Sequence, residues 1–216
     1  EEIIERGREI ASTLLEATIA DIAFEDGCFT IVGTDRSVSL DEIAASVKGL
    51  TEEANYSADA PTFPNGTHIC EVEIDGETGR VEIASYVAVD DVGVELNPML
   101  LAGQIHGGVA QGIGQALMEA VIFESDSGQN LTGSFMDYAM PRADDLCFIE
   151  TGSHSVPTAL NPLGVKGAGE AGTVGALPAT MCAICDALGT DDVPMPATPE
   201  VIWRVLTGAQ RQEDEN

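Results

Sequence analysis

Ile69-Cys70-Glu71-Val72-Glu73-Ile74 alternates apolar and polar residues and is the clearest β-strand signal in the chain. Alternation with a period of two is typical of a strand that buries one face. The turn residues Asp75-Gly76-Glu77-Thr78-Gly79 follow, and the apolar pattern resumes over residues 81–89. These features predict a long antiparallel hairpin. The second strand runs into Asp90-Asp91-Val92-Gly93, at a strand end, where loops commonly build functional sites.

Helical patterns lie on both sides of this hairpin. Apolar residues recur at helical spacing over residues 2–16, and Ser39 with Glu42 forms a capping box at the start of a short helix that ends near Val47. Glu25-Asp26-Gly27-Cys28 predicts the turn of a second, shorter hairpin. Further helices are predicted over residues 99–123, 174–188 and 199–206, and a strand over residues 147–150. We expect an α+β fold, with an antiparallel or mixed sheet and packed helices.

A polar segment separates the chain into two parts. Residues 49–66 contain Pro61 and Pro64 and show no regular apolar period, which predicts a long connection. We therefore expect a helix-hairpin-helix segment over residues 1–60 and a larger domain over residues 61–216.

The predicted helix over residues 99–123 is long and contains five glycines. Each glycine inside a helix costs about 1 kcal/mol relative to alanine, so these glycines need a reason. A flat face on the helix admits close contact with either another buried element or a bulky ligand near Gln104, and the sequence favours neither alternative. The pairs that leave such faces are Gly103 with Gly107 and Gly108 with Gly112.

The chain is strongly acidic. Its 216 residues include 37 Asp and Glu against nine Lys and Arg, a net charge of −28. This charge excludes nucleic acid and anionic membranes as partners. Hydrophobic residues make up 44% of the chain, enough for a core, and no apolar run approaches the roughly 20 residues that span a bilayer. Because molar salt screens self-repulsion of this size, we expect a salt-adapted protein of a halophile, located in the cytoplasm.

The cysteines and histidines indicate no local site. The cysteine count of five is odd and does not fit a secreted disulfide framework. Cys182 and Cys185 have the spacing of a metal or redox motif, but they lie in a mostly apolar helical segment, which favours core packing. His68, His106 and His154 are too far apart in sequence to indicate a metal site.

One carboxylate, Glu170, lies in the glycine-rich segment Asn161-Pro-Leu-Gly-Val-Lys-Gly-Ala-Gly-Glu-Ala-Gly-Thr173. Glycine lets a backbone approach a bound group closely, and a lone acid on such a backbone is a candidate general base. The alternative is a glycine-rich turn with one solvated glutamate. Gly167-x-Gly169-x-x-Gly172 matches a dinucleotide-binding pattern, but no apolar strand precedes it, which disfavours a nucleotide site. Lys166 is placed to meet an anionic group.

Segments along almost the whole chain match one known family in order and spacing. They are Pro64-Asn-Gly66-Thr-His68, Val89-Asp-Asp91-Val-Gly93 with Asn97-Pro98, Gly103-Gln-Ile-His-Gly-Gly108 with Gln111-Gly-Ile-Gly-Gln-Ala-Leu117, Asp137-Tyr138-x-x-Pro141 and Asn161–Gly172. These segments resemble the C-terminal part of the molybdenum-binding large subunit of the molybdenum hydroxylases. That family includes xanthine dehydrogenase, aldehyde oxidoreductases and the large chain of aerobic carbon monoxide dehydrogenase.

The resemblance implies an oxidoreductase, with this chain as part of a larger molybdopterin-binding domain. The family hydroxylates its substrate with oxygen from water, at molybdenum held by a pterin, often a pterin cytosine dinucleotide. Electrons leave through iron–sulfur clusters and usually FAD on other domains or chains. By the same resemblance Glu170 is the general base that takes the proton from the water-derived oxygen, and no residue of this chain is a metal ligand. Positions that contact or approach the pterin are Gln104, Lys166, Gly167, Asp91 and Gly93.

The resemblance leaves the substrate and the completeness of the site open. Val92 stands where carbon-monoxide-type members often have Cys, and Ala171-Gly172-Thr173 looks more like the aldehyde and heterocycle oxidisers. The family's full subunit is several times longer than this chain. We therefore expect the chain to need the rest of the molybdenum subunit, with iron–sulfur and flavin subunits, and to bind no cofactor tightly alone. The alternative is a non-catalytic, truncated interaction module that folds only with a partner chain.

Overall fold

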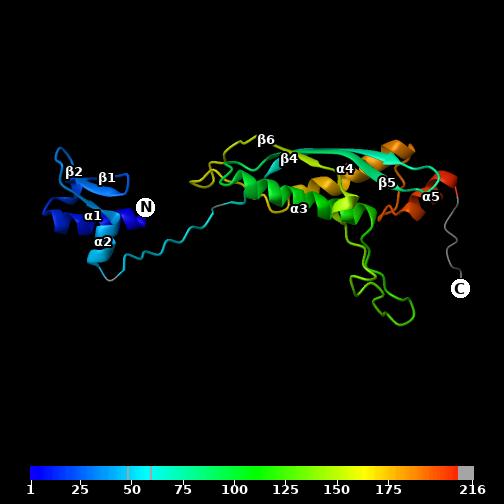
Figure 1. Cartoon of the computed structure of the whole chain (residues 1–216), viewed down its shortest axis with the longest axis horizontal. Helices are drawn as coiled ribbons and strands as arrows, with labels where there is room; N and C mark the ends of the chain where they lie inside the picture. The colour runs from blue at the N-terminus through cyan, green and yellow to red at the C-terminus, as the bar shows by residue number, and fades with distance from the viewer. Residues whose placement is uncertain (48, 59, 209–216) are drawn as a thin grey trace. The chain divides into compact units, whose positions relative to one another are not determined.

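The computed structural model describes residues 1–47, 49–58 and 60–208. The chain divides into two compact units, Glu1–Ser57 and Ala58–Asn216, each with its own hydrophobic core (Figure 1).

The smaller unit packs two helices with a three-stranded antiparallel sheet. Its elements are α1 (Glu2–Leu15), a 3-10 turn (Ile19–Asp21), β1 (Ile22–Glu25), β2 (Cys28–Ile31), β3 (Ser37–Ser39) and α2 (Leu40–Ser46). β1 and β2 form the predicted short hairpin, which turns at Asp26 and Gly27. The predicted capping box is confirmed, because the Ser39 and Glu42 side chains each accept a hydrogen bond from the other residue's backbone N–H. β3 is too short for an alternating pattern to predict it.

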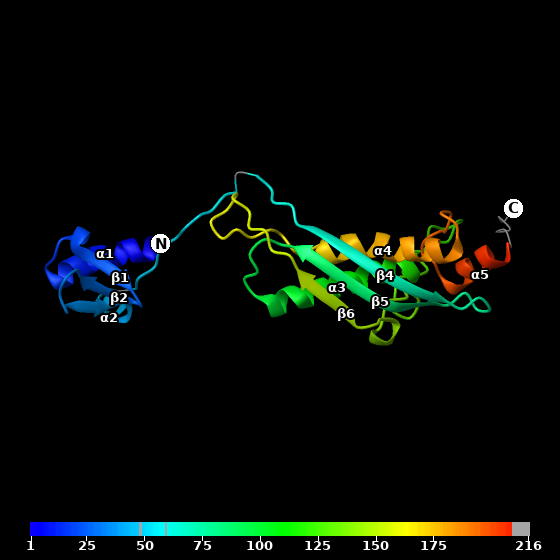
Figure 2. The same ribbon diagram turned by 90° about the horizontal axis from the view of Figure 1, so that it is seen from above.

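The larger unit is built on a mixed sheet with the strand order β4-β5-β6 (Figure 2). Its strands are β4 (Asn65–Ile74), β5 (Val81–Asp91) and β6 (Ile149–Ser153). β4 and β5 form the predicted long antiparallel hairpin, from Ile74 opposite Val81 to Asn65 opposite Asp91. β6 pairs in parallel with β5, which makes the sheet mixed.

Helices cover one face of this sheet. α3 (Pro98–Leu117) and α4 (Ala171–Leu188) run side by side beneath the strands, and α5 (Pro199–Thr207) follows (Figures 1 and 2). Val72 and Tyr86 belong to the core on the helix side, whereas Ile69 and Val89 are exposed on the opposite face. The α+β class, with a mixed sheet and one long glycine-rich helix, is therefore confirmed.

The prediction that α3 continues to Phe123 is wrong, because the helix ends at Leu117. Met118 leaves the helical region of backbone space, with φ −148°. The β-branched Val121 and Ile122 that follow favour extended structure. Ile122 accepts a backbone hydrogen bond from Leu131, so the next residues form a loop that turns back on itself.

The expectation that no apolar segment approaches the length of a membrane span needs a correction for α4. Its 18 residues are long and apolar enough, by length and composition, to cross a membrane. In this unit α4 packs one face against α3 and β4, and the buried residues on that face are Gly172, Ala176, Thr180 and Ile184.

Candidate functional site

The glycine-rich segment before α4 is fastened to the end of β5 by an ion pair. Lys166 Nζ lies 2.5 Å from Asp91 Oδ2, and the two side chains are only 11% and 13% exposed. Asp91 Oδ1 accepts hydrogen bonds from the backbone N–H groups of Gly93 and Val156. The Lys166 ammonium and these two N–H donors hold the pKa of Asp91 well below its usual range. The ion pair therefore fixes the start of the glycine-rich segment.

Backbone contacts add to this ion pair. The Lys166 N–H donates to the carbonyl of Val92 at 2.8 Å, and the Val94 N–H donates to the carbonyl of Gly164 at 3.0 Å. Gly93 has a positive φ of 68°, and a Cβ at this position would lie 2.2 Å from the Gly164 oxygen. Only glycine fits there. In this structure Gly93 thus serves the contact between the two loops.

Gln104 connects α3 to the other end of the glycine-rich segment. Its Nε2 donates to the carbonyl oxygen of Gly169 at 2.8 Å. Gly169 directly precedes Glu170 in the chain. The Thr173 hydroxyl donates to the carbonyl oxygen of Gly108 at 3.0 Å, one turn further along both helices. Gln104, Asp91 and Lys166, which are far apart in sequence, therefore all hold the segment that ends at Glu170.

The two glycine pairs of α3 have different surroundings. A Cβ on Gly108 or Gly112 would lie within 3.0 Å of atoms of α4, so this pair permits close packing of the two helices. Within the described ranges, no atom lies within 4 Å of a Cβ placed on Gly103 or Gly107. For Gly108 and Gly112, the structure thus confirms one of the two alternatives, close contact with another buried element. Gly103 and Gly107 form an open surface.

Glu170 occupies the N-cap position of α4 and is exposed. Its carboxylate makes no capping hydrogen bond with the described part of the chain. Gly167 and Gly169 beside it also have open space where a Cβ would lie. The carboxylate is therefore held on a fixed backbone and remains available to a group that approaches this glycine surface.

Glu170 also borders a cleft of about 300 Å³, which a buried polar cluster lines from the sheet side. His68 of β4 and Asp90 of β5 line this cleft, and their side chains are each 4% exposed. His68 Nδ1 lies 2.8 Å from the Tyr86 hydroxyl, and Nε2 lies 3.4 Å from Asp90 Oδ1. Sequence reasoning missed this cluster. The signal in the sequence is the two-residue alternation: His68 points to the same face of the sheet as the partly buried Val72, and Asp90 to the same face as the buried Tyr86.

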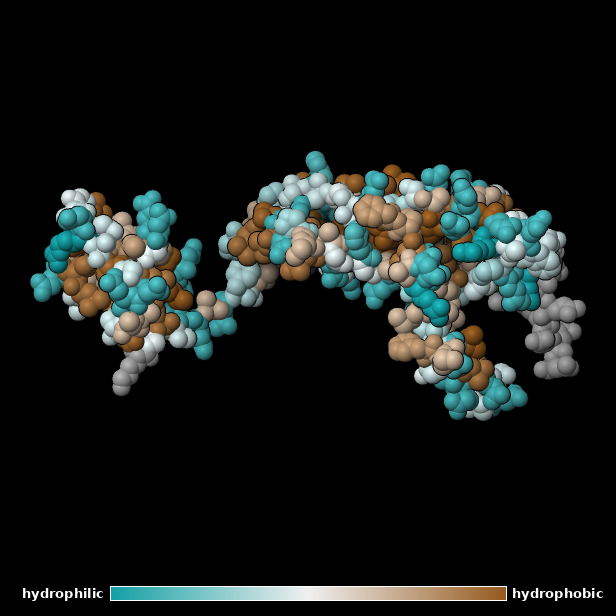
Figure 3. Space-filling model, viewed as in Figure 1, coloured by the Kyte–Doolittle hydropathy of each residue, from teal (hydrophilic) through white to brown (hydrophobic). Residues whose placement is uncertain are grey.

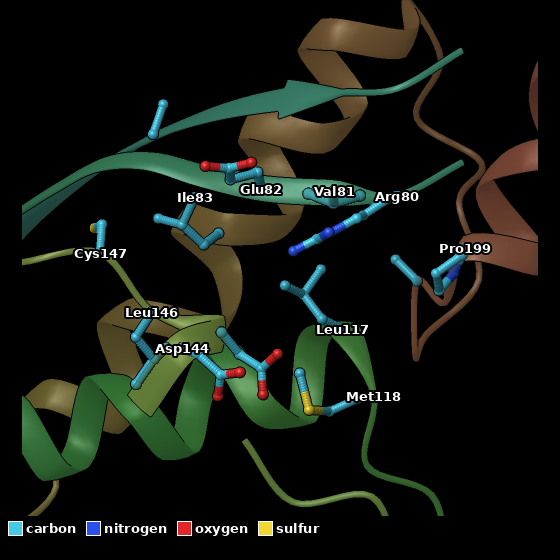
Figure 4. Close-up of a pocket in the computed structure, with 13 residues that line it drawn as sticks. Arg80, Val81, Glu82, Ile83, Leu117, Met118, Asp144, Leu146, Cys147 and Pro199 are labelled. Atoms are coloured by element: carbon cyan, nitrogen blue, oxygen red, sulfur yellow. The ribbon is translucent and has the colours of Figure 1, made fainter. Parts of the chain in front are cut away.

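A second cleft, of about 450 Å³, lies between the start of β5, the end of α3 and the segment before β6 (Figure 4). Arg80, Glu82 and Asp144 line it together with apolar side chains. The residues predicted for the site do not line this cleft. Among the described residues, no group of three or more His, Cys, Asp and Glu could hold a metal ion.

Comparison with known proteins identifies the family. The family model of the molybdopterin cofactor-binding domain matches residues 1–147. The gamma subunit of the 6-hydroxypseudooxynicotine dehydrogenase complex of Paenarthrobacter nicotinovorans is 36% identical over 98% of this chain and 28% of its own length. The carbon monoxide dehydrogenase large chain of Hydrogenophaga pseudoflava is 33% identical over 93% of this chain and 26% of its own length.

Solved structures agree with these relatives. The Cu,Mo-CO dehydrogenase superposes with a TM-score of 0.86 and 29% identity, over 96% of this chain and 28% of that chain. Quinoline 2-oxidoreductase from Pseudomonas putida 86 superposes with a TM-score of 0.82 and 34% identity, over 95% of this chain and 28% of that chain. The chain thus spans about a quarter of the length of the relatives that it matches. It belongs to the molybdopterin cofactor-binding family and is part of the large subunit of a molybdenum hydroxylase.

Proposed function

We propose that this chain supplies the general base and one wall of the cofactor pocket in a molybdenum hydroxylase. The observation that carries the proposal is the fixed position of Glu170. The segment that leads into Glu170 is held at its start by the ion pair of Lys166 with Asp91 and at its end by the Gln104 contact to Gly169. The carboxylate itself stays exposed beside an open glycine surface. A general base needs this combination of fixed geometry and access.

The open surface fits one side of a large cofactor. Gly103 and Gly107 of α3 and Gly167 and Gly169 of the loop have no described atom where a Cβ would lie, so a ring system can approach their backbone closely. Lys166 adds positive charge beside this surface, although Asp91 already accepts one of its three ammonium donors. We propose that Gln104, Lys166, Gly167, Asp91 and Gly93 hold this side of a molybdopterin, in its cytosine dinucleotide form.

When bound, the molybdenum cofactor accepts the electrons of the substrate. The chain's own part is to position Glu170, which takes a proton from the water-derived oxygen as that oxygen attacks the substrate carbon. Several relatives are named as a nicotine 6-hydroxylase, a carbon monoxide dehydrogenase and a hypoxanthine oxidase. A structural neighbour is named as an aldehyde oxidoreductase. We propose a substrate of one of these classes: an aldehyde, a nitrogen heterocycle or carbon monoxide.

The remaining parts of the enzyme are proposed to lie on other segments or chains. The relative that is 36% identical is named as a subunit of a complex, which supports an assembly of several chains. We propose the rest of the molybdenum subunit, an iron–sulfur subunit and a flavin subunit as partners. The five unpaired cysteines support a cytoplasmic location.

Exchange of the carboxylate for an amide tests this proposal. In the assembled enzyme, Glu170→Gln should lower kcat by about 10²–10⁴-fold, because an amide cannot accept the proton. The molybdenum content should stay at the wild-type level, since the residues proposed to hold the cofactor are unchanged. Glu200→Gln, at an exposed acid in the first turn of α5, should leave both values unaltered. Turnover that survives in Glu170→Gln would exclude Glu170 as the base.

A second candidate function is a non-catalytic module that completes a partner's fold. The observation that favours it is the loop that projects from the end of α3 (the green loop in Figure 1), which carries apolar side chains on its surface (Figure 3). Phe135 is 83% exposed and Met136 is 92% exposed. An assembly that lacks this chain and still turns over would favour this candidate over the first.

A further inference from the structure

His68 and Asp90 of the buried cluster line the same cleft as Glu170, and Tyr86 contacts His68. His68 Nδ1 contacts the Tyr86 hydroxyl at 2.8 Å, and His68 Nε2 lies 3.4 Å from Asp90 Oδ1. Burial, the largest cause, and the nearby Cys70 and Asp90 raise the pKa of Tyr86, so its hydroxyl keeps its proton. The imidazole is thus fixed between a neutral hydroxyl and a carboxylate.

Two glycines make room for this cluster. A Cβ on Gly66 would lie 1.9 Å from Asp90 Oδ1, and a Cβ on Gly175 would lie 2.5 Å from the His68 ring. Gly175 belongs to the early part of α4, the helix whose N-cap residue is Glu170. The imidazole therefore lies flat against the backbone of the helix that carries the proposed base.

Two atoms of the cluster lack partners. His68 Nε2 and Asp90 Oδ2 are buried, and neither forms a hydrogen bond with the described part of the protein. Buried polar atoms of native proteins are generally satisfied by protein groups or by ordered water. Both residues line the cleft of about 300 Å³ that Glu170 also borders. A cleft of this size, with polar groups on both sides, has room for several water molecules.

We propose that this cleft is the outlet through which protons leave Glu170, with His68 as the accepting group and Asp90 and Tyr86 as the residues that position it. The inference rests on the proposed role of Glu170 as the base. It assigns a function to three side chains that do not belong to the glycine surface.

The transfer needs no electron acceptor. The O–H bond of the protonated Glu170 carboxyl breaks, and the proton passes through water in the cleft to form an N–H bond at His68 Nε2. This step requires the tautomer whose resting proton is on Nδ1, where the N–H donates to the Tyr86 hydroxyl oxygen. The imidazolium then lies beside the Asp90 carboxylate until water at the mouth of the cleft takes the proton. Glu170 is again a carboxylate, and His68 is again neutral.

Proton release in a single turnover tests the proposal in the assembled enzyme. A pH-indicator dye reports release, and the spectrum of the reduced cofactors reports substrate oxidation. In His68→Gln, release should lag behind oxidation and slow by about tenfold or more, because an amide can form hydrogen bonds but cannot accept and return a proton. Added imidazole should restore the rate, which a purely structural loss would not allow. His154→Gln, at an exposed histidine outside the cleft, is the matched control.

A second variant guards against loss of the fold. Asp90→Asn keeps the imidazole and removes the carboxylate beside it, so release should slow less than in His68→Gln and should again respond to imidazole. Molybdenum content is measured in both variants. Release at the wild-type rate in both, or slow release that imidazole does not restore, would overturn the outlet. If Glu170→Gln loses turnover while His68→Gln is unaffected, only the outlet fails; if Glu170→Gln keeps turnover, the proposed base fails first.

Discussion

Asp90 and Asp91 are neighbours in β5, yet they act on opposite faces of the strand. Successive side chains of a strand point to opposite sides. Asp91 pairs with Lys166 and fastens the loop before Glu170, whereas Asp90 turns to the buried face and approaches His68, which packs against the helix after Glu170. The proposed base is thus supported from both directions by two consecutive acids.

The ion pair of Asp91 should make the stability of the larger unit sensitive to acid. Its pKa is lowered in the folded state, so its contribution is complete above the pKa of the unfolded carboxyl, about 4, and is lost as the pH falls through the lower folded value. Asp91→Asn should therefore lower the thermal midpoint at pH 7, and the difference from wild type should shrink below about pH 4. Thermal unfolding from pH 2 to pH 7 measures this, with Asp126→Asn in an exposed turn as control. A difference that is constant with pH would contradict the role of the pair.

Sequence patterns predicted those elements whose signal is local. The alternation of residues 69–74 and 81–89 is complete within each strand, and the β4–β5 hairpin matches it. The parallel partner β6 lies about 60 residues further along the chain, so its pairing leaves no local pattern. α3 ends at Leu117, earlier than its apolar residues suggest, and the Tyr138 hydroxyl donates to the Glu119 carboxylate just after this end. Helix propensity, which depends on neighbouring residues, cannot predict a contact with a residue as distant as Tyr138.

The candidate site was predictable only in part. The sequence itself indicates Glu170 as a candidate base, a lone acid among glycines, and Lys166 as a partner for an anionic group. Pterin contacts of Gln104 and Lys166 are implied only by the resemblance. The contact between Lys166 and Asp91 spans 75 positions and follows from no spacing rule. The distance between His68 and the other histidines in the sequence disfavours a local metal site, but it does not indicate which residues the fold places beside His68. Its place on the buried face of β4 was nevertheless visible in the alternation.

The glycines of α3 give an experiment at the level of the element. Gly112→Ala should destabilise the unit by about 1–3 kcal/mol, because its Cβ would lie 2.6 Å from that of Ala176 and overpack the contact with α4. Gly103→Ala meets no described atom and should stabilise the isolated chain by about 1 kcal/mol through helix propensity. Urea unfolding of both variants measures the difference. Equal effects would show that the helices do not pack as closely as described.

On the scale of the whole molecule, the dominant features are the net charge and the small share of its relatives' length that the chain spans. The net charge of −28 is spread over 216 residues, and the chain spans about a quarter of its relatives' length. Large apolar side chains of the projecting loop are exposed, which the rest of a longer subunit could bury. Salt adaptation is our proposal for the net charge.

Self-repulsion of this size should make stability depend on salt. Raising KCl from 0.1 M to 3 M should raise the thermal midpoint by at least several degrees, since the Debye length falls from about 10 Å to below 3 Å. The rise should be smaller in a variant in which several exposed acids of α1 are replaced by Gln: Glu2, Glu5 and Glu9. A midpoint that does not change with KCl would exclude salt adaptation.

Asp90 and Asp91 contact partners on opposite faces of β5, and this requirement limits where residues can be inserted into or deleted from the strand. One residue inserted between Tyr86 and Asp90 would shift the register, turning Asp90 outward and Asp91 toward His68. Neither acid would then reach its partner. Insertions and deletions in homologous chains should therefore gather in the turn around Gly76 and in the loop after α3, and avoid the last five residues of this strand.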